Sequence, residues 1–253
     1  MNKSLSPIFP AYTFRASPTY FAWVKLTAAD VQKLRSERGF EGQNLYFYHN
    51  HPIRFVSITA PVVQIEDLFG KYALLALDDG SGANATVKIT RLPAEITNSI
   101  DCPSNTEVDN LNIISSLGRF DISVDDTVLD IGTVVKVKCT ISEFRGTKQL
   151  DLKRVHVVKS TSEEVKAWED VVKWKRDVLS KPWVLTPKEL NDLETSERAL
   201  RRMKRLEERA EEEHQRVRVV KKAKRKEKMR LHEEKVEKRR RQEEVIMNAG
   251  ALL

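Results

Sequence analysis

The sequence predicts a mainly β protein, because its middle part consists of short strand-like segments separated by turns. Five segments are rich in β-branched and apolar residues or alternate between apolar and polar positions: residues 53–65, 72–77, 84–91, 133–141 and 149–158. The sequence DDGSG at 78–82 separates the second segment from the third, and RGTK at 145–148 separates the fourth from the fifth. Such residues favour tight turns, so we expect two hairpins.

The order of these segments favours one particular fold. Three strands, a long polar connection over residues 92–129 and a final hairpin match the Greek-key order of a five-stranded OB-fold barrel. The element between the third and fourth strands of such a barrel is usually a helix, and we expect a short helix near residues 111–117. Pro61 interrupts the first strand, which predicts a bulge or an edge there.

The chain divides into four parts by composition and pattern. Residues 1–50 are an N-terminal extension, residues 51–160 the OB-fold domain, residues 161–185 a helix that flanks it, and residues 186–253 a charged basic tail. The extension holds many large aromatic side chains, and packing on the barrel is favoured over a base-stacking surface. The tail lacks a continuous apolar face, so it is a solvated helix or a disordered arm.

The flanking helix is expected to begin at residue 161, where Thr161 and Glu164 have capping-box spacing, and to end at Lys181-Pro182. Its apolar residues recur at helical spacing: Val165, Trp168, Val172 and Leu179. This stripe can pack against the chain's own barrel or dock a partner.

The net charge of +7 is concentrated in the tail. Residues 188–253 hold 21 Lys and Arg against 15 Asp and Glu, and the totals of 44 and 37 leave 23 against 22 for residues 1–187. A nearly neutral body argues against a strongly electrostatic nucleic-acid clamp there. The run KKAKRKEK at 221–228 fits a nuclear-import signal.

Several classes of function are not expected. Cys102 and Cys139 are too few for a disulfide framework, and His49 and His51 lack the spacing of a metal site, so no metal or cofactor is predicted. No nucleophile–base set or P-loop occurs, which argues against an enzyme. Without a long apolar run or a leader pattern, the chain is expected to be intracellular and not membrane-bound. The adjacent pair Asp78-Asp79 precedes Gly-Ser-Gly, so we expect turn formation from it.

The best candidate for contact with single-stranded DNA is the second hairpin tip, 144–148. Phe144 offers a ring on which any base can stack, and Arg145 and Lys148 offer charges for phosphates. An ordinary hairpin with one buried ring fits the same residues. Four further positions are equally compatible with solvated strand surface: Lys88, Arg91, Arg54 and Tyr72.

Three stretches carry a resemblance to a known family. They are PAYTFRASPTYFAWVKLTAADV at 10–31 with YFYHNHPIRF at 46–55, then LLALDDGSG at 74–82, and the region 131–184, which includes IGTVVKVKCTISEFRGTKQLDLKRV and STSEEVKAWEDVVKWKRDVLSKPWV. As a set they resemble the fungal Stn-type subunit of the CST telomere-capping complex, a family similar to the middle subunit of replication protein A. The resemblance covers roughly residues 8–185.

The resemblance implies an OB fold, a nuclear location at telomeres, affinity for single-stranded DNA and a heterodimer with a small Ten-type OB-fold subunit. In this family the helix after the barrel pairs with the partner's helix, so we favour a partner interface at Val165, Trp168, Val172 and Leu179. Phe144 stands where the family often places an aromatic residue. Further partners implied are a large CST subunit and polymerase α–primase.

Two departures from the family pattern bear on function. Some relatives carry winged-helix domains after the OB fold, whereas this sequence continues as a charged tail. The polymerase α–primase contacts that depend on those domains in the relatives are therefore not supported by this departure. Some relatives place an aromatic residue where Lys88-Ile89-Thr90 stands here. We therefore expect a single-stranded telomeric DNA-binding subunit acting in chromosome end protection and telomere replication. The alternative is an interaction scaffold whose partner subunit does most of the DNA binding.

Overall fold

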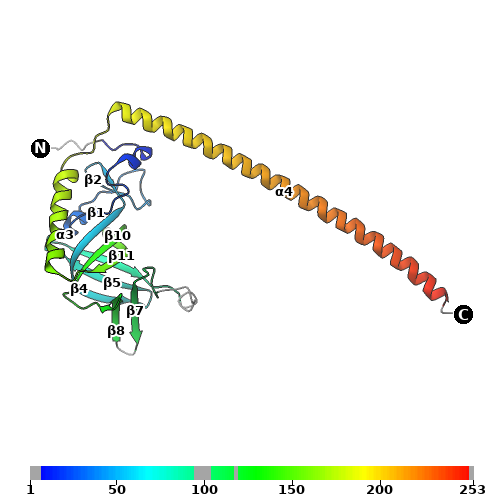
Figure 1. Ribbon diagram of the computed structural model, residues 1–253, viewed down its shortest axis with the longest axis horizontal. Coiled ribbons are helices and arrows are strands. Elements are labelled where there is room, and N and C mark those ends of the chain that lie inside the picture. The colour runs from blue at the N-terminus through cyan, green and yellow to red at the C-terminus, as the bar shows by residue number, and fades with distance from the viewer. Residues whose placement is uncertain (1–6, 94–103, 117–118, 251–253) are drawn as a thin grey trace. The chain divides into compact units, whose positions relative to one another are not determined.

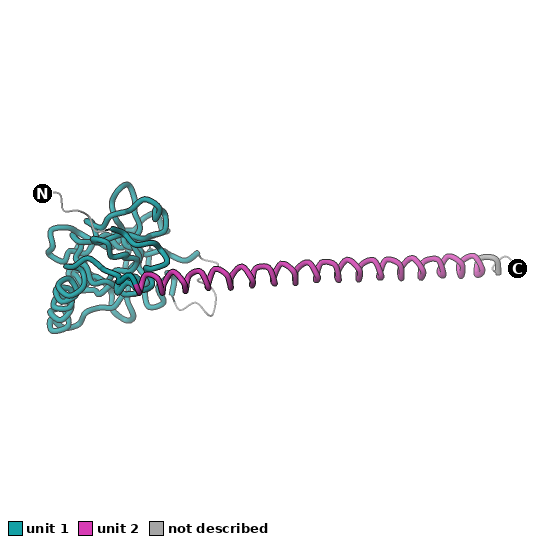
Figure 2. The backbone as a smooth tube through the Cα atoms, turned by 90° about the horizontal axis from the view of Figure 1, so that it is seen from above, with its two compact units in different colours: residues 1–187 teal, residues 188–253 magenta. Residues whose placement is uncertain are grey.

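The computed structural model describes residues 7–93, 104–116 and 119–250. The chain forms two compact units, residues 1–187 and residues 188–253 (Figure 2). Every strand among the described residues lies in the first unit, and the second unit is helical. Cys102 and Leu117 lie outside the described residues.

The first unit is built on one large sheet. Its strands are β1 (Val24–Lys25), β4 (Phe55–Leu68), β5 (Tyr72–Asp78), β6 (Asn84–Thr90), β10 (Val134–Phe144) and β11 (Thr147–Val157). They lie in the order β1-β4-β10-β11-β6-β5, and β4 also pairs with β5 (Figure 1). The pairings of β4, β10, β11, β6 and β5 therefore form a closed ring. A mainly β fold with a C-terminal helix is confirmed.

The sheet has six strands where the sequence predicted five. The extra strand is β1, which pairs in parallel with β4 through Val24 and Val56 and through Lys25 and Ser57. Two residues are too few to show alternation, which is why β1 was missed. The register between β4 and β5 shifts between Val62 and Gln64, next to Pro61, where a bulge or edge was predicted.

The two-residue period of the strands determines which side chains form the core. Alternate side chains of β5, β6 and β10 are fully buried, while their neighbours are partly exposed. Burial of a Leu or Ile side chain such as Leu75 or Ile89 stabilises the fold by roughly 1.5–3 kcal/mol. Cys139 is one of these core residues, and burial raises the pKa of its thiol, so it acts as a small apolar side chain.

The connection between β6 and β10 is a second, smaller sheet. It contains β7 (Leu111–Ser116), β8 (Arg119–Val124) and β9 (Thr127–Val128), paired in sequence order. The short helix expected near residues 111–117 is therefore wrong. Leu111 and Ile113 are buried while Ile114 is exposed, and that period of two favours a strand. Asn105 covers the edge of β7 by bonding both the N–H and the carbonyl of Ile113.

The N-terminal residues contribute η1 (Ala11–Ala16), α1 (Ala28–Gln32), β2 (Tyr46–Tyr48) and β3 (His51–Ile53). Several rings pack with one another in a separate apolar cluster centred on Phe14, Phe47 and Trp183. Asp78 and Asp79 form the predicted turn by accepting bonds from Gly80 and Ser81 N–H. Asp79 also accepts a bond from Ala28 N–H, so the turn caps the start of α1.

After β11 the chain forms α3 (Thr161–Trp174) and a π-helical turn, η2 (Lys175–Leu179). The N-cap is Ser160, whose hydroxyl accepts from Glu163 N–H at 3.3 Å, one residue before the predicted Thr161. The next segment returns to β3. His51 Nε2–H donates to the Lys181 carbonyl at 2.8 Å, and Asn50 bonds both backbone polar groups of Trp183.

The second unit is the helix α4 (Pro187–Gly250), whose side chains are solvent-exposed over almost its whole length. Within the described residues, no helix combines the length and the apolar character needed to span a bilayer.

We expect His51 to make stability sensitive to acid. The ring is 2% exposed, its Nδ1 has no hydrogen-bond partner among the described residues, and burial lowers its pKa. Because the unfolded chain then binds a proton more readily than the folded chain, stability is full above about pH 6.5 and falls below it. Thermal unfolding from pH 7.5 to 5 should show a steeper loss for wild type than for His51→Gln, which keeps a donor. The exposed His156→Gln should behave like wild type, and equal slopes for all three would contradict this role.

Candidate nucleic-acid interface and partner surface

The outward side chains of β5, β6 and β11 form the first candidate surface. Lys88 on β6 lies opposite Leu74 on β5 and beside Asp151 on β11. Its ammonium is 2.7 Å from the Asp151 carboxylate and 5.5 Å from the centre of the Tyr72 ring. The structure thus brings Lys88 and Tyr72 together, but a carboxylate already neutralises the lysine.

Arg91 follows β6 at the end near the turn between β4 and β5, and its side chain is also paired with a carboxylate. Its guanidinium is 2.9 Å from the Asp67 carboxylate and stacks over Phe120 at 5.5 Å. Its backbone N–H donates to the Lys71 carbonyl, which places it beside the turn between β4 and β5. A phosphate would have to displace Asp67 to reach this cation.

The tip between β10 and β11 presents a ring and a cation to solvent. Phe144 is 55% exposed. The Arg145 guanidinium lies 5.1 Å from the centre of that ring, and Arg145 has no carboxylate partner among the residues that the structure describes. Arg145 has a φ of 52° and Gly146 a φ of 78°, as a tight two-residue turn requires.

Lys148 lies at the base of that hairpin and is braced by α1. The side-chain amide of Gln32 donates to the Lys148 carbonyl at 3.0 Å and accepts from its N–H at 3.3 Å. The Lys148 ammonium contacts the Gln32 carbonyl at 3.5 Å and lies over the Tyr46 ring. Lys148 therefore supports the hairpin as well as carrying charge.

Phe69, which was not among the residues predicted from the sequence, is 96% exposed at the turn between β4 and β5. Its φ is 54° and Gly70 follows with a φ of 66°. The sequence does contain a signal for Phe69. The run Phe69-Gly70-Lys71 has the same residue types, an aromatic residue, a glycine and a lysine, as the second hairpin tip. Because Tyr72 pairs with Thr90 and Leu150 with Val87, the two tips lie at opposite ends of β6, which spans roughly 20 Å.

Arg54 does not lie with these residues. Its guanidinium is 5.4 Å from the Tyr20 ring and 5.3 Å from the Phe55 ring, at the start of β4. Trp23 and Lys138 continue this second group of rings and cations beside β1 and β10. Since β4 and β10 lie across the ring of strands from β6, Arg54 is separated from Lys88 and Tyr72.

The second candidate surface is the outward side of α3. Val165, Trp168 and Val172 are each at least half exposed, with Trp168 at 52%. The ring of Trp168 also borders a cavity of about 280 Å³ between α3 and the barrel, lined in part by Leu26 and Thr59. An apolar stripe that the fold leaves uncovered fits a docking surface.

Two ion pairs hold α3 in place and leave this stripe outward. Lys25 on β1 is 2.7 Å from Asp170, and its hydrogen bond lowers the pKa of that carboxyl. Lys175 donates to both oxygens of the buried Asp30 at 2.9 and 2.7 Å, which raises the pKa of the lysine. The helix is therefore attached through charged residues beside its apolar stripe.

Leu179 is not part of this surface, although the sequence placed it there. It is completely buried in the main core. The step of seven from Val172 assumes an unbroken α-helix, but residues Lys175–Leu179 form a π-helical turn in which Ser180 N–H bonds the Lys175 carbonyl. The wider turn moves Leu179 off the outward face and into the core.

These features define a mainly β protein with an OB-fold-like sheet, exposed rings at two of its hairpin tips and an uncovered apolar helix face. Its fold is similar to that of yeast Stn1 in a crystal structure of yeast Stn1 and Ten1, with a TM-score of 0.52 and 18% identity over 75% of this chain and 91% of that one. The family model for the telomere regulation protein Stn1 matches residues 40–239, which is most of the chain. The chain belongs to the Stn1 family.

Mammalian relatives are similar to part of the chain. The CST complex subunit STN1 of Bos taurus is 26% identical over 144 residues, or 56% of this chain and 37% of the relative. The Rattus norvegicus subunit is 25% identical over 142 residues, or 56% of this chain and 34% of the relative. The chain thus spans little more than a third of these curated relatives.

Proposed function

We propose that this protein is a single-stranded DNA-binding subunit of a telomere-capping complex, acting in the nucleus in chromosome end protection and telomere replication. The observation that carries the proposal is the pair of exposed rings, Phe69 and Phe144, at the two ends of β6, with Tyr72 beside the end near Phe69. Membership of the Stn1 family supports the telomeric role. We interpret β4, β10, β11, β6 and β5 as the OB-fold barrel, with β1 as an addition.

The two tips favour recognition by stacking more than by charge. Each aromatic ring on which a base stacks contributes roughly 1–3 kcal/mol to binding of single strands, whatever the base. Lys88 and Arg91 are paired with carboxylates, so few phosphate contacts are available without rearrangement. This predicts binding that depends only weakly on salt, because few counterions are released.

We further propose that Val165, Trp168 and Val172 dock a small Ten-type OB-fold subunit. The yeast relative was crystallised with Ten1, and the stripe is apolar and uncovered in this chain. A half-exposed Trp beside a cavity is a typical interface hot spot, since a partner can complete its burial.

A second candidate function is an interaction scaffold whose partner does most of the DNA binding. Two ion pairs, Lys88–Asp151 and Arg91–Asp67, favour the scaffold function, because they neutralise a cation on β6 and the cation that follows it. Titration of labelled single-stranded oligonucleotide by fluorescence anisotropy, with and without the small partner, separates the two functions. Binding only in the presence of the partner would favour the scaffold.

Phe69→Ala and Phe144→Ala should each weaken single-strand binding by roughly 1–3 kcal/mol, because each removes a stacking ring. Neither side chain is buried, so thermal stability should change little. The control is Phe21→Ala, a phenylalanine that is also exposed and contacts Tyr20 outside this surface. Wild-type affinity in both tip variants would show that the tips are not the binding site.

Asp151→Asn should strengthen single-strand binding at low salt. The substitution frees the Lys88 ammonium from its carboxylate partner, so one more phosphate contact becomes available. The slope of log affinity against log salt should steepen by about 0.7 for that contact. The double variant Asp151→Asn with Lys88→Gln should lose the gain. An unchanged slope in the single variant would place the strand elsewhere.

Trp168→Ala should weaken binding of the partner, whereas Leu179→Ala should lower the stability of the fold. Loss of Trp168 should weaken the heterodimer by at least about 2 kcal/mol, roughly thirtyfold, with little change in the melting temperature of the chain alone. Loss of the buried Leu179 should destabilise the fold by about 2–5 kcal/mol. Calorimetry and co-purification measure both effects. A Trp168→Ala chain that melts far below wild type yet binds the small subunit normally would assign the Trp to the core.

A further inference from the structure

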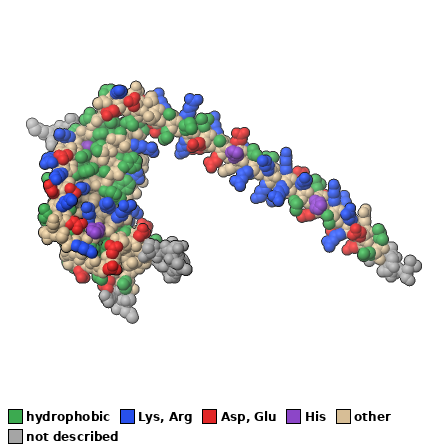
Figure 3. Space-filling view, in the orientation of Figure 1, with side chains coloured by type: hydrophobic (Ala, Val, Ile, Leu, Met, Phe, Trp, Pro, Cys, Tyr) green, Lys and Arg blue, Asp and Glu red, His purple; other side chains and the backbone are tan. Residues whose placement is uncertain are grey.

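The most basic part of the chain is a segment of α4 that includes the run KKAKRKEK at 221–228, which fits a nuclear-import signal. The basic segment, residues 216–230, contains one acidic residue, Glu227, and nine cations: Arg216, Arg218, Lys221, Lys222, Lys224, Arg225, Lys226, Lys228 and Arg230. All its side chains are exposed. Figure 3 shows Lys and Arg side chains on both sides of the helix. No packing within the described unit covers this segment.

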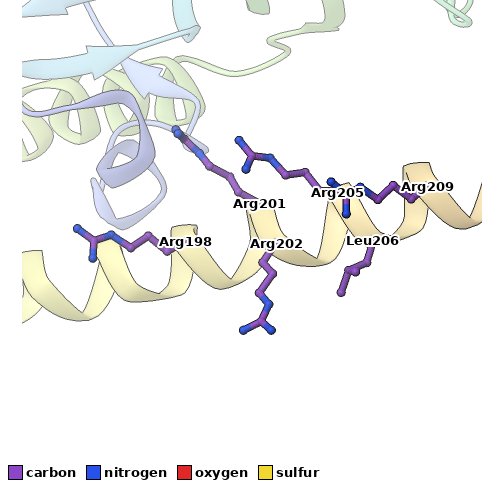
Figure 4. A pocket seen from close by; sticks show the side chains of 6 residues that line it. All are labelled: Arg198, Arg201, Arg202, Arg205, Leu206 and Arg209. Carbon is purple, nitrogen blue, oxygen red and sulfur yellow. The ribbon is translucent and has the colours of Figure 1, made fainter.

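Near its start, α4 pairs its cations with carboxylates, which the basic segment does not do. Arginines near the start of the helix pair with glutamates one turn earlier, as in Glu194–Arg198 at 2.6 Å and Glu197–Arg201 at 2.8 Å. Figure 4 shows several of these arginines, with Arg201 and Arg205 on one side of the helix and Arg202 on the other. Between residues 209 and 236, all of them described, no ion pair is formed.

Inside the basic segment, neighbours along the helix repel each other. Five pairs of cations stand four residues apart: Arg218 and Lys222, Lys221 and Arg225, Lys222 and Lys226, Lys224 and Lys228, and Lys226 and Arg230. Like charges at this spacing destabilise an isolated helix. Neither packing nor ion pairs compensate for that repulsion here, so an external polyanion would stabilise the helix.

The distribution of charge around the helix indicates which polyanion fits. At about 100° per residue, the nine cations leave no gap wider than about 80° around the axis. A helix that lies on an anionic membrane needs a wide apolar face, which this distribution excludes. A rod that is positive all round fits between two walls of phosphate, and the major groove of a duplex is wide enough to admit an α-helix.

We propose that the basic segment binds the phosphate backbone of double-stranded DNA, and that binding stabilises its helix. Its fifteen residues span about 22 Å, along which a duplex carries one charge per ~1.7 Å. This site is separate from the stacking surface of the first unit and does not depend on that surface.

The test uses the full chain and two variants with equal loss of charge. In the first, Lys221, Lys222, Lys224, Arg225 and Lys226 are replaced by Gln, which favours helix. In the control, Arg198, Arg201, Arg202, Lys204 and Arg205 are replaced by Gln. Binding to a labelled duplex is titrated at several salt concentrations. The first variant should lose at least about tenfold in affinity and most of the salt slope, while the control stays close to wild type.

Further arms identify the ligand and separate this site from the single-strand site. Duplex DNA should raise helicity by far-ultraviolet circular dichroism in wild type but not in the first variant, and Phe144→Ala should keep full duplex binding. An equal loss of duplex affinity in both five-residue variants would overturn the proposal. So would tighter binding of this segment to a single strand, to heparin or to anionic vesicles than to the duplex. Unchanged duplex binding with lost nuclear accumulation would assign the segment to import instead.

Discussion

The double pairing of β4 is the constraint on which the rest of the first unit depends. The first half of this strand pairs with β10 and the second half with β5, and the register shift after Pro61 lies where the partner changes. A strand that serves two neighbours must bend sharply, and a bulge beside a proline provides that bend. Because this bend closes the ring of strands, both hairpin tips and the strand between them take their places from it.

The two candidate surfaces differ in how the fold supports them. The apolar side of α3 sits on a helix held by Lys25 and by the buried Asp30, so its side chains have a rigid support. The exposed rings of Phe69 and Phe144 lie at hairpin tips, and the hydrogen bonds between Gln32 and Lys148 support the tip that carries Phe144. The apolar stripe and the exposed rings are thus built on different kinds of element.

The sequence predicted what depends on local pattern. The five long strands were located by β-branched and apolar segments between turn residues, with clean period-two alternation at 133–141. Helical spacing located the start of α3 to within one residue of its cap. It did not show that β7 to β9 would replace a helix, because a short apolar run is ambiguous between the two. The π-helical turn that buries Leu179 depends on packing against the barrel, which the spacing of residues does not contain.

The sequence could predict which types of residue form the candidate site, but not which of its cations are neutralised by ion pairs. Phe144 could be chosen because a ring at a hairpin tip is a local feature, whereas Phe69 was a single ring in a short turn like many others. The pairing of Lys88 with Asp151 joins distant parts of the chain through β6 and β11. Only the register of those strands reveals that a lysine on the candidate surface is already neutralised.

The brace from Gln32 to Lys148 links α1 to the hairpin tip that carries Phe144. A loop that is ordered before binding loses less conformational entropy when a ligand arrives, so its contacts yield tighter binding. Gln32 supplies that order to the tip carrying Phe144, although the two residues lie far apart in the sequence. If the tip binds single-stranded DNA as proposed, a change at Gln32 alters the affinity without changing the Phe144 ring.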